Sequence, residues 1–150
     1  MPADSAQSDM IKLYSGRILA LAADIPHAAR LEAPQASVKK RSPLCGSAVT
    51  VDISLADGVV SAFGQDVKAC ALGQAAASVV GGAILGRTPD ELTSARDALR
   101  ALLKGSGTVP ADPFGGFEVF LPASAYKNRH ASILLSIEAA CEAAEQALSA

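Results

Sequence analysis

The sequence predicts an α+β fold, a small antiparallel three-stranded sheet with helices packed on it. Residues 48–55 alternate between apolar and polar side chains, which is the pattern of a half-buried strand. Asp57-Gly58 comes next and suits a tight hairpin turn, because glycine adopts a positive φ without strain. Residues 59–67 then form the returning strand, and segments with helical apolar spacing lie on both sides of this hairpin.

Two elements are expected before the hairpin. A first helix, capped by Ser8 or Asp9, carries apolar residues at helical spacing and is ended by Pro26. Val38 lies among polar residues and predicts a short edge strand. The basic run Lys39–Arg41 on this strand either protects the sheet edge or forms a docking patch.

The remainder of the chain is predicted to be mainly helical. Residues 71–85 combine strong helix formers with glycines, which indicates close backbone packing. Thr88-Pro89-Asp90-Glu91 predicts the start of another helix, with proline at the first position and glutamate three residues after threonine. Gly105 ends that helix, residues 106–117 form a loop rich in glycine and proline, and a last helix covers about residues 129–148.

Composition and charge restrict the class of protein. The 150 residues are expected to form one domain, 1–150, with residues 1–9 as a flexible tail. Thirteen basic and 15 acidic residues give a net charge of −2, which argues against a nucleic-acid partner. Residues 69–86 are uncharged, but their alanine, glycine and serine content favours a buried helix over a membrane span. Three cysteines are too few for a disulfide framework and suggest a reducing, cytoplasmic location.

Two cysteines flank the hairpin. Cys45 precedes its first strand and Cys70 follows its second, so both are expected at the same edge of the sheet. Cys70 also precedes a predicted helix, whose free N–H groups favour a thiolate. Such a pair either shares a metal ion or serves as two buried small apolar side chains. The sequence has no GxGxxG, GxxxxGK[ST], HExxH or CxxC motif, which gives little support for an enzyme.

Several short segments carry a resemblance to a known family. They are Tyr14 with Ile18-Leu19, Pro26, Pro43-Leu44-Cys45-Gly46, Val49-Thr50-Val51, Asp57-Gly58, Ala69-Cys70-Ala71, Gln74-Ala75-Ala76-Ala77-Ser78 and Arg129-His130-Ala131-Ser132-Ile133-Leu134. Together these segments resemble the IscU/NifU-type iron–sulfur cluster assembly scaffolds over most of the chain. The resemblance implies the same α+β fold.

The resemblance also implies a ligand set. Members of the family hold a nascent [2Fe–2S] cluster or a zinc ion through three cysteines and a carboxylate. Cys45 and Cys70 match the first two cysteines, and His130 matches the histidine of a His-Cys pair. Ala131 stands where the third cysteine belongs, which in the family is the usual sulfur acceptor. Ser47 stands where the family has an aspartate that keeps the cluster labile.

Cys45, Cys70 and His130 are therefore the candidate ligands of Zn²⁺ or a [2Fe–2S] cluster. Two thiolates and an imidazole suit Zn²⁺ with a fourth position left open. A cluster needs a further ligand, which Ser47, Asp66 or a second subunit would supply. Cys141 lies roughly 15 Å along the last helix from Ala131 and is expected to pack within the fold.

We therefore expect a diverged scaffold, not an enzyme, that binds a metal ion or cluster. The resemblance implies a cysteine desulfurase or other iron–sulfur assembly proteins as partners. No membrane partner is expected from the composition, and the chain is a candidate homo-oligomer. The alternative is a metal-free interaction or regulatory module that keeps the scaffold fold and binds assembly partners. A third hypothesis, a thiol enzyme with Cys70 as nucleophile and His130 as base, lacks any substrate-positioning signature.

Overall fold

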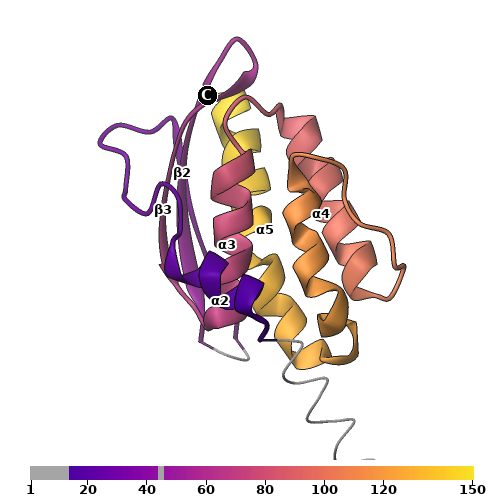
Figure 1. Ribbon diagram of the computed structural model, residues 1–150. Helices are drawn as coiled ribbons and strands as arrows, with labels where there is room; N and C mark the ends of the chain where they lie inside the picture. Colours follow the sequence, from indigo (N-terminus) through magenta and orange to yellow (C-terminus); the bar gives the residue numbers. More distant parts are fainter. Residues whose placement is uncertain (1–13, 44–45) are drawn as a thin grey trace, which may run out of the picture.

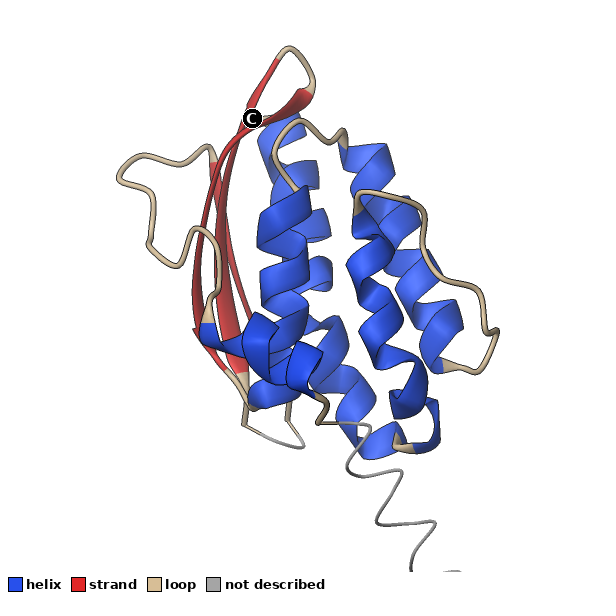
Figure 2. Cartoon of the chain, viewed as in Figure 1, coloured by secondary structure: helices blue, strands red, loops and turns tan. Residues whose placement is uncertain are grey.

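Helices cover one face of a three-stranded antiparallel sheet, whose strands lie in the order β1–β2–β3 (Figure 1, Figure 2). The structure is a computed structural model and describes residues 14–43 and 46–150. Sheet and helices together confirm the predicted α+β fold. The elements are, in chain order, α2 (Gly16–Ala23), β1 (Ala36–Arg41), β2 (Ala48–Ala56), β3 (Val59–Lys68), α3 (Ala71–Ala83), α4 (Pro89–Leu103), the 3₁₀ helix η1 (Phe114–Ala125) and α5 (Lys127–Ser149).

The β2–β3 hairpin forms as its alternation predicts. Val49, Val51 and Ile53 of β2 are all buried in the core. Asp57 and Gly58 have φ angles of 53° and 78°, the left-handed conformation that a tight two-residue hairpin turn requires. The turn lies at the upper end of the sheet in Figure 1, so the start of β2 and the end of β3 meet at the lower end.

The longest helix, α5, packs on the sheet and lies beside both α3 and α4 (Figure 1). It packs against β1, β2, α3, α4 and η1. Many of its buried residues are small, which lets the neighbouring backbones approach closely. These small buried residues are Ser132, Ser136, Ala139, Ala140, Cys141, Ala143, Ala144 and Ala147.

Helix starts follow the local capping chemistry. Thr88 and Glu91 form the predicted capping box of α4, since each side chain pairs with the backbone N–H of the other residue. Ser15 caps α2 through a hydrogen bond from the Ile18 N–H to its Oγ. The predicted caps Ser8 and Asp9 lie outside the described residues.

The segment before α5 corrects the sequence prediction of a loop through residue 117. Residues 114–125 form η1, and its apolar side chains recur at every third position, as the three residues per turn of a 3₁₀ helix require. The rings of Phe114 and Phe117 stack with centroids 5.9 Å apart, and Phe120 packs beside them. These rings bury an apolar stripe that the neighbouring glycines and prolines obscure in the sequence.

Hydrogen bonds hold the loop between α2 and β1 against part of the outer face of the sheet. Asp52 on β2 is fully buried and accepts hydrogen bonds from the Arg30 guanidinium, the Leu31 N–H and the Ser37 hydroxyl. Gly64 on β3 gives the loop room, because a Cβ there would lie 2.3 Å from the Ala29 carbonyl oxygen. Figure 2 shows this loop beside the sheet, on the side away from the helices.

The two edges of the sheet differ in their contacts. On β3, the Val60 N–H donates to the Arg87 carbonyl and the Gln65 N–H donates to the His27 carbonyl. On β1, the predicted edge strand, the basic run is divided by strand alternation. Lys40 turns inward and pairs with Glu142 on α5 at 2.8 Å, whereas Lys39 is exposed.

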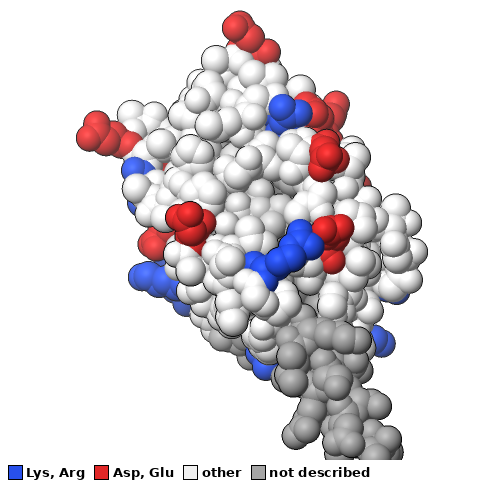
Figure 3. Space-filling model, in the orientation of Figure 1, with Lys and Arg blue, Asp and Glu red and all other residues white. Residues whose placement is uncertain are grey.

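Charged side chains are dispersed over the face shown in Figure 3, without a large patch of either sign. Within the described residues, no helix is both long and apolar enough to span a membrane. The uncharged stretch at 69–86 instead contains α3, a 13-residue helix with most of its side chains buried. The prediction of a buried helix is therefore confirmed.

We expect Asp52→Asn to lower the free energy of unfolding by about 2–3 kcal/mol, because three donors lose a charged acceptor in a buried site. Burial alone would raise the pKa of Asp52, but its hydrogen bonds from Arg30, Ser37 and Leu31 and the Arg30 charge hold that pKa below its usual value. The carboxylate therefore stabilises the fold fully above the unfolded pKa of about 3.9, and this contribution is lost as pH falls through the lower folded pKa.

Urea unfolding of wild type and Asp52→Asn between pH 3 and 7 measures this difference. It should be constant near neutrality and shrink in acid. Asp57→Asn is the control, since Asp57 is an exposed turn residue and its substitution should change stability by less than about 0.5 kcal/mol. Equal stability of the two variants at pH 7 would contradict a stabilising role for the hydrogen bonds to Asp52.

Candidate metal or cluster site

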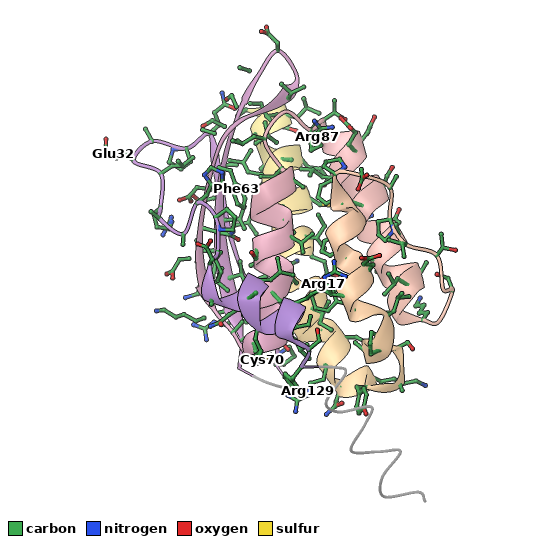
Figure 4. All side chains as sticks on the ribbon, in the orientation of Figure 1. Arg17, Glu32, Phe63, Cys70, Arg87 and Arg129 are labelled. Atoms are coloured by element: carbon green, nitrogen blue, oxygen red, sulfur yellow. The ribbon has the colours of Figure 1, made fainter. Side chains whose placement is uncertain are left out.

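Cys70 lies where β3 passes into α3, at the lower end of the molecule in Figure 4. It is the N-cap residue of α3, with an extended backbone, and its carbonyl accepts the first helical hydrogen bond from Gln74. Its side chain is partly exposed and makes no capping hydrogen bond. The sulfur therefore makes no hydrogen bond to the backbone of α3 and lies beside the N-terminus of this helix, the positive end of its dipole.

A buried serine of α5 contacts this sulfur. The Oγ of Ser132 lies 3.4 Å from the Sγ of Cys70 and 3.2 Å from the Oγ of Ser47. Ser132 and Ser47 are 2% and 3% exposed, so this hydroxyl pair is shielded from bulk solvent. Ser132 thus connects the start of α3 with the residue that precedes β2.

Two backbone hydrogen bonds link residues that precede β2. The Ser42 N–H donates to the Ser47 carbonyl at 2.8 Å, and the Gly46 N–H donates to the Ser42 carbonyl at 3.0 Å. Cys45 falls within this segment and lies outside the described residues. Through Ser47, these hydrogen bonds connect Ser42 and Gly46 to Ser132.

Gly73, one turn into α3, makes room for the serine. A Cβ at Gly73 would lie 2.6 Å from the Ser132 Oγ and 2.8 Å from the Cβ of Ala69, both too close for real contacts. The glycine therefore lets α3 approach α5 closely enough for Cys70 and Ser132 to touch.

His130 is held by a backbone carbonyl. Its Nε2 lies 2.8 Å from the carbonyl oxygen of Ala123, at the end of η1. Because a carbonyl only accepts hydrogen bonds, Nε2 carries the hydrogen, and in the neutral ring Nδ1 keeps its lone pair. Metal-bound histidines commonly donate their other N–H in this way.

The remaining candidate residues are separated from Cys70 to different degrees. Asp66 is exposed and pairs with Thr50 in the register of the outer sheet face. Ala131 is partly buried at the start of α5. Cys141 is buried farther along α5, where burial raises the pKa of its thiol to about 11. This environment agrees with the predicted packing role.

Within residues 14–43 and 46–150, no three His, Cys, Asp or Glu side chains form a group that could hold a metal ion. Cys45 is not part of that set. The described arrangement around Cys70 therefore comprises one partly exposed sulfur and two buried hydroxyls, and His130, held by a carbonyl, precedes Ser132 by two residues on α5.

The sequence patterns identified the cysteine but missed Ser132 as a neighbour of its sulfur. In the sequence, Ser132 is a polar residue at a buried position of a mainly apolar helix, and Ser136 one turn later is another. A serine in that setting has to find a hydrogen-bond partner, which is the signal that could have drawn attention to it.

The architecture defines an iron–sulfur cluster assembly scaffold-like fold. A solved structure of the N-terminal part of a nitrogen-fixing NifU-like protein from Brucella abortus matches 94% of this chain and 98% of its own, with 41% identity and a TM-score of 0.91. The chain therefore belongs to the IscU/NifU-type family.

More distant structures share the fold. A proposed iron–sulfur cluster assembly scaffold protein for the SUF system, from Fervidobacterium islandicum, matches 89% of this chain and 98% of its own at 18% identity, with a TM-score of 0.79. A hypothetical protein matches 90% of this chain and 98% of its own at 17% identity, with a TM-score of 0.77. No family model and no curated protein sequence matches the chain.

Gly73→Ala should destabilise the protein by about 1–3 kcal/mol, because the added methyl group overpacks the contact between α3 and Ser132. Gly82→Ala is the matched control on the same helix. Nothing lies within 4 Å of a Cβ at Gly82, so alanine there should stabilise the helix by about 1 kcal/mol. Urea unfolding of both variants measures the two effects, and an equal gain in stability at both positions would contradict the close approach.

Proposed function

We propose that this protein is a scaffold in iron–sulfur cluster assembly, which carries a metal ion or a [2Fe–2S] cluster on Cys45, Cys70 and His130. The observation that carries this proposal is the position of Cys70. Its partly exposed sulfur stands at the positive end of α3, and its own helix leaves it uncapped. The name of the Fervidobacterium neighbour describes the same kind of protein.

The donor set is chemically suited to such cargo. Thiolate sulfur binds both zinc and iron–sulfur clusters well, and imidazole nitrogen suits zinc and iron. The Ala123 carbonyl leaves Nδ1 of His130 as the nitrogen with a free lone pair, which supports this residue as a ligand.

A fourth ligand is needed for a complete tetrahedral site. The Ser132 hydroxyl contacts both Ser47 and Cys70, whereas Asp66 lies on the outer sheet face. These positions support Ser47 over Asp66, and a second copy of the chain is the other source of a ligand. Because Ala131 replaces a third thiol, the fourth coordination position also remains accessible to water or to a partner's donor atom.

The chain's own residues would hold and release the cargo. The N–H groups at the start of α3 would favour a negatively charged cluster bound beside them. An open coordination position favours transfer to or from another protein. We infer a cysteine desulfurase or other iron–sulfur assembly proteins as the partners, in the cytoplasm, and no enzymatic turnover by the chain itself.

Metal and sulfide content of anaerobically purified and reconstituted protein tests this proposal. Wild type should bind Zn²⁺ or a cluster, whereas Cys45→Ala and Cys70→Ala should each weaken binding by more than about 100-fold, because both remove a direct ligand. Cys141→Ala removes a buried thiol elsewhere and should bind as wild type does. Wild type that takes up neither metal nor cluster would refute the proposal.

Ala131→Cys tests how much the missing thiol limits the scaffold. A third thiolate should raise the yield and lifetime of a reconstituted [2Fe–2S] cluster, since it fills the open position. Absorption and Mössbauer spectra of wild type and variant measure the difference. If neither protein holds a cluster or a metal ion, while a cysteine desulfurase still binds wild type, the metal-free interaction module is the better description.

A further inference from the structure

We propose that Ser132 is the positioning residue of this site, which holds the Cys70 sulfur and Ser47 in a fixed relation. The inference rests on the proposed function for its link to cargo. The arrangement itself rests on described atoms, since the Ser132 hydroxyl lies within hydrogen-bond distance of both the Cys70 Sγ and the Ser47 Oγ.

The donors and acceptors define how this contact works. A thiolate only accepts hydrogen bonds, so a charged Cys70 requires the Ser132 O–H to donate to its sulfur. The Ser132 oxygen then accepts from the Ser47 hydroxyl. The resulting chain runs from Ser47 through Ser132 to Cys70 and aligns the sulfur without occupying all of its lone pairs.

The fold accommodates this serine specifically. Gly73 leaves the space that the hydroxyl fills, and Ser132 is almost completely buried. Ser136, one turn farther along α5, is equally buried, yet within the described part of the chain its hydroxyl has no hydrogen-bond partner. Burial on α5 alone therefore does not account for the contacts of Ser132.

Ser42 and Gly46 are linked to the Ser132 contact through Ser47. Ser47 accepts the Ser42 N–H through its carbonyl, and Ser42 in turn accepts the Gly46 N–H. Loss of the Ser132 hydroxyl removes a side-chain contact between Ser47 and α5. We expect these two backbone hydrogen bonds to open more often in consequence.

The test uses the full chain, with Co²⁺ as the probe under anaerobic conditions, in wild type, Ser132→Ala and Ser136→Ala. Ser132→Ala should bind Co²⁺ about 10–100-fold more weakly, as expected for loss of a group that orients a ligand. Its thiolate-to-cobalt charge-transfer band should move to longer wavelength, because the sulfur loses a hydrogen bond that stabilised its lone pairs. Ser136→Ala should match wild type in affinity and spectrum.

Hydrogen–deuterium exchange of the metal-free proteins supplies a readout that needs no cargo. The amides of Ser42 and Gly46 should exchange faster in Ser132→Ala and at the wild-type rate in Ser136→Ala. Circular dichroism melts establish that both variants are folded at the temperature of the measurement.

The outcomes separate the two proposals. Wild type that binds no Co²⁺ refutes the proposed function, and the exchange rates alone then decide whether Ser132 positions Ser47. If Ser132→Ala binds Co²⁺ with unchanged affinity and spectrum, or if Ser136→Ala shows equal losses, the positioning role is refuted. Unchanged exchange at Ser42 and Gly46 refutes the link through Ser47.

Discussion

The structure depends on the close packing of α5 against every layer around it. A helix can touch a sheet, two helices and a 3₁₀ segment at once only if its side chains are short where the backbones approach. The chain has 31 alanines, and several of them line the buried side of α5. Small residues bury less apolar area each, so stability must come from many close contacts. Gly73 opposite Ser132 extends the same packing to the edge of the site.

The sequence predicted the elements whose signals are local. The hairpin has strict alternation and an Asp57-Gly58 turn, and α4 has its capping box, so each could be recognised from neighbouring residues alone. η1 was missed because Gly115 and Gly116 indicate a loop, whereas the period of three in Phe114, Phe117 and Phe120 is easily read as chance. The Ser132 contacts join residues 62 and 85 positions apart, and no local pattern encodes such a distance.

The candidate site shows the same division between local and distant signals. Cys70 could be placed from its position between a strand and a helix, and the structure agrees with that placement. The orientation of its sulfur depends on a residue of α5, and the tautomer of His130 depends on the Ala123 carbonyl. Short motifs thus indicate candidate ligands, whereas the orientation of these side chains depends on the assembled tertiary structure.

The contacts at the edges of the sheet bear on the tendency of the protein to aggregate at high concentration. Exposed strand edges are templates on which other chains add strands, and such addition leads to aggregates. On β3, the segments at His27 and Arg87 occupy backbone groups that a foreign strand would need. On β1, a short strand with an exposed lysine repels an identical copy. These contacts reduce the number of free backbone groups with which the sheet could pair with that of a neighbouring molecule.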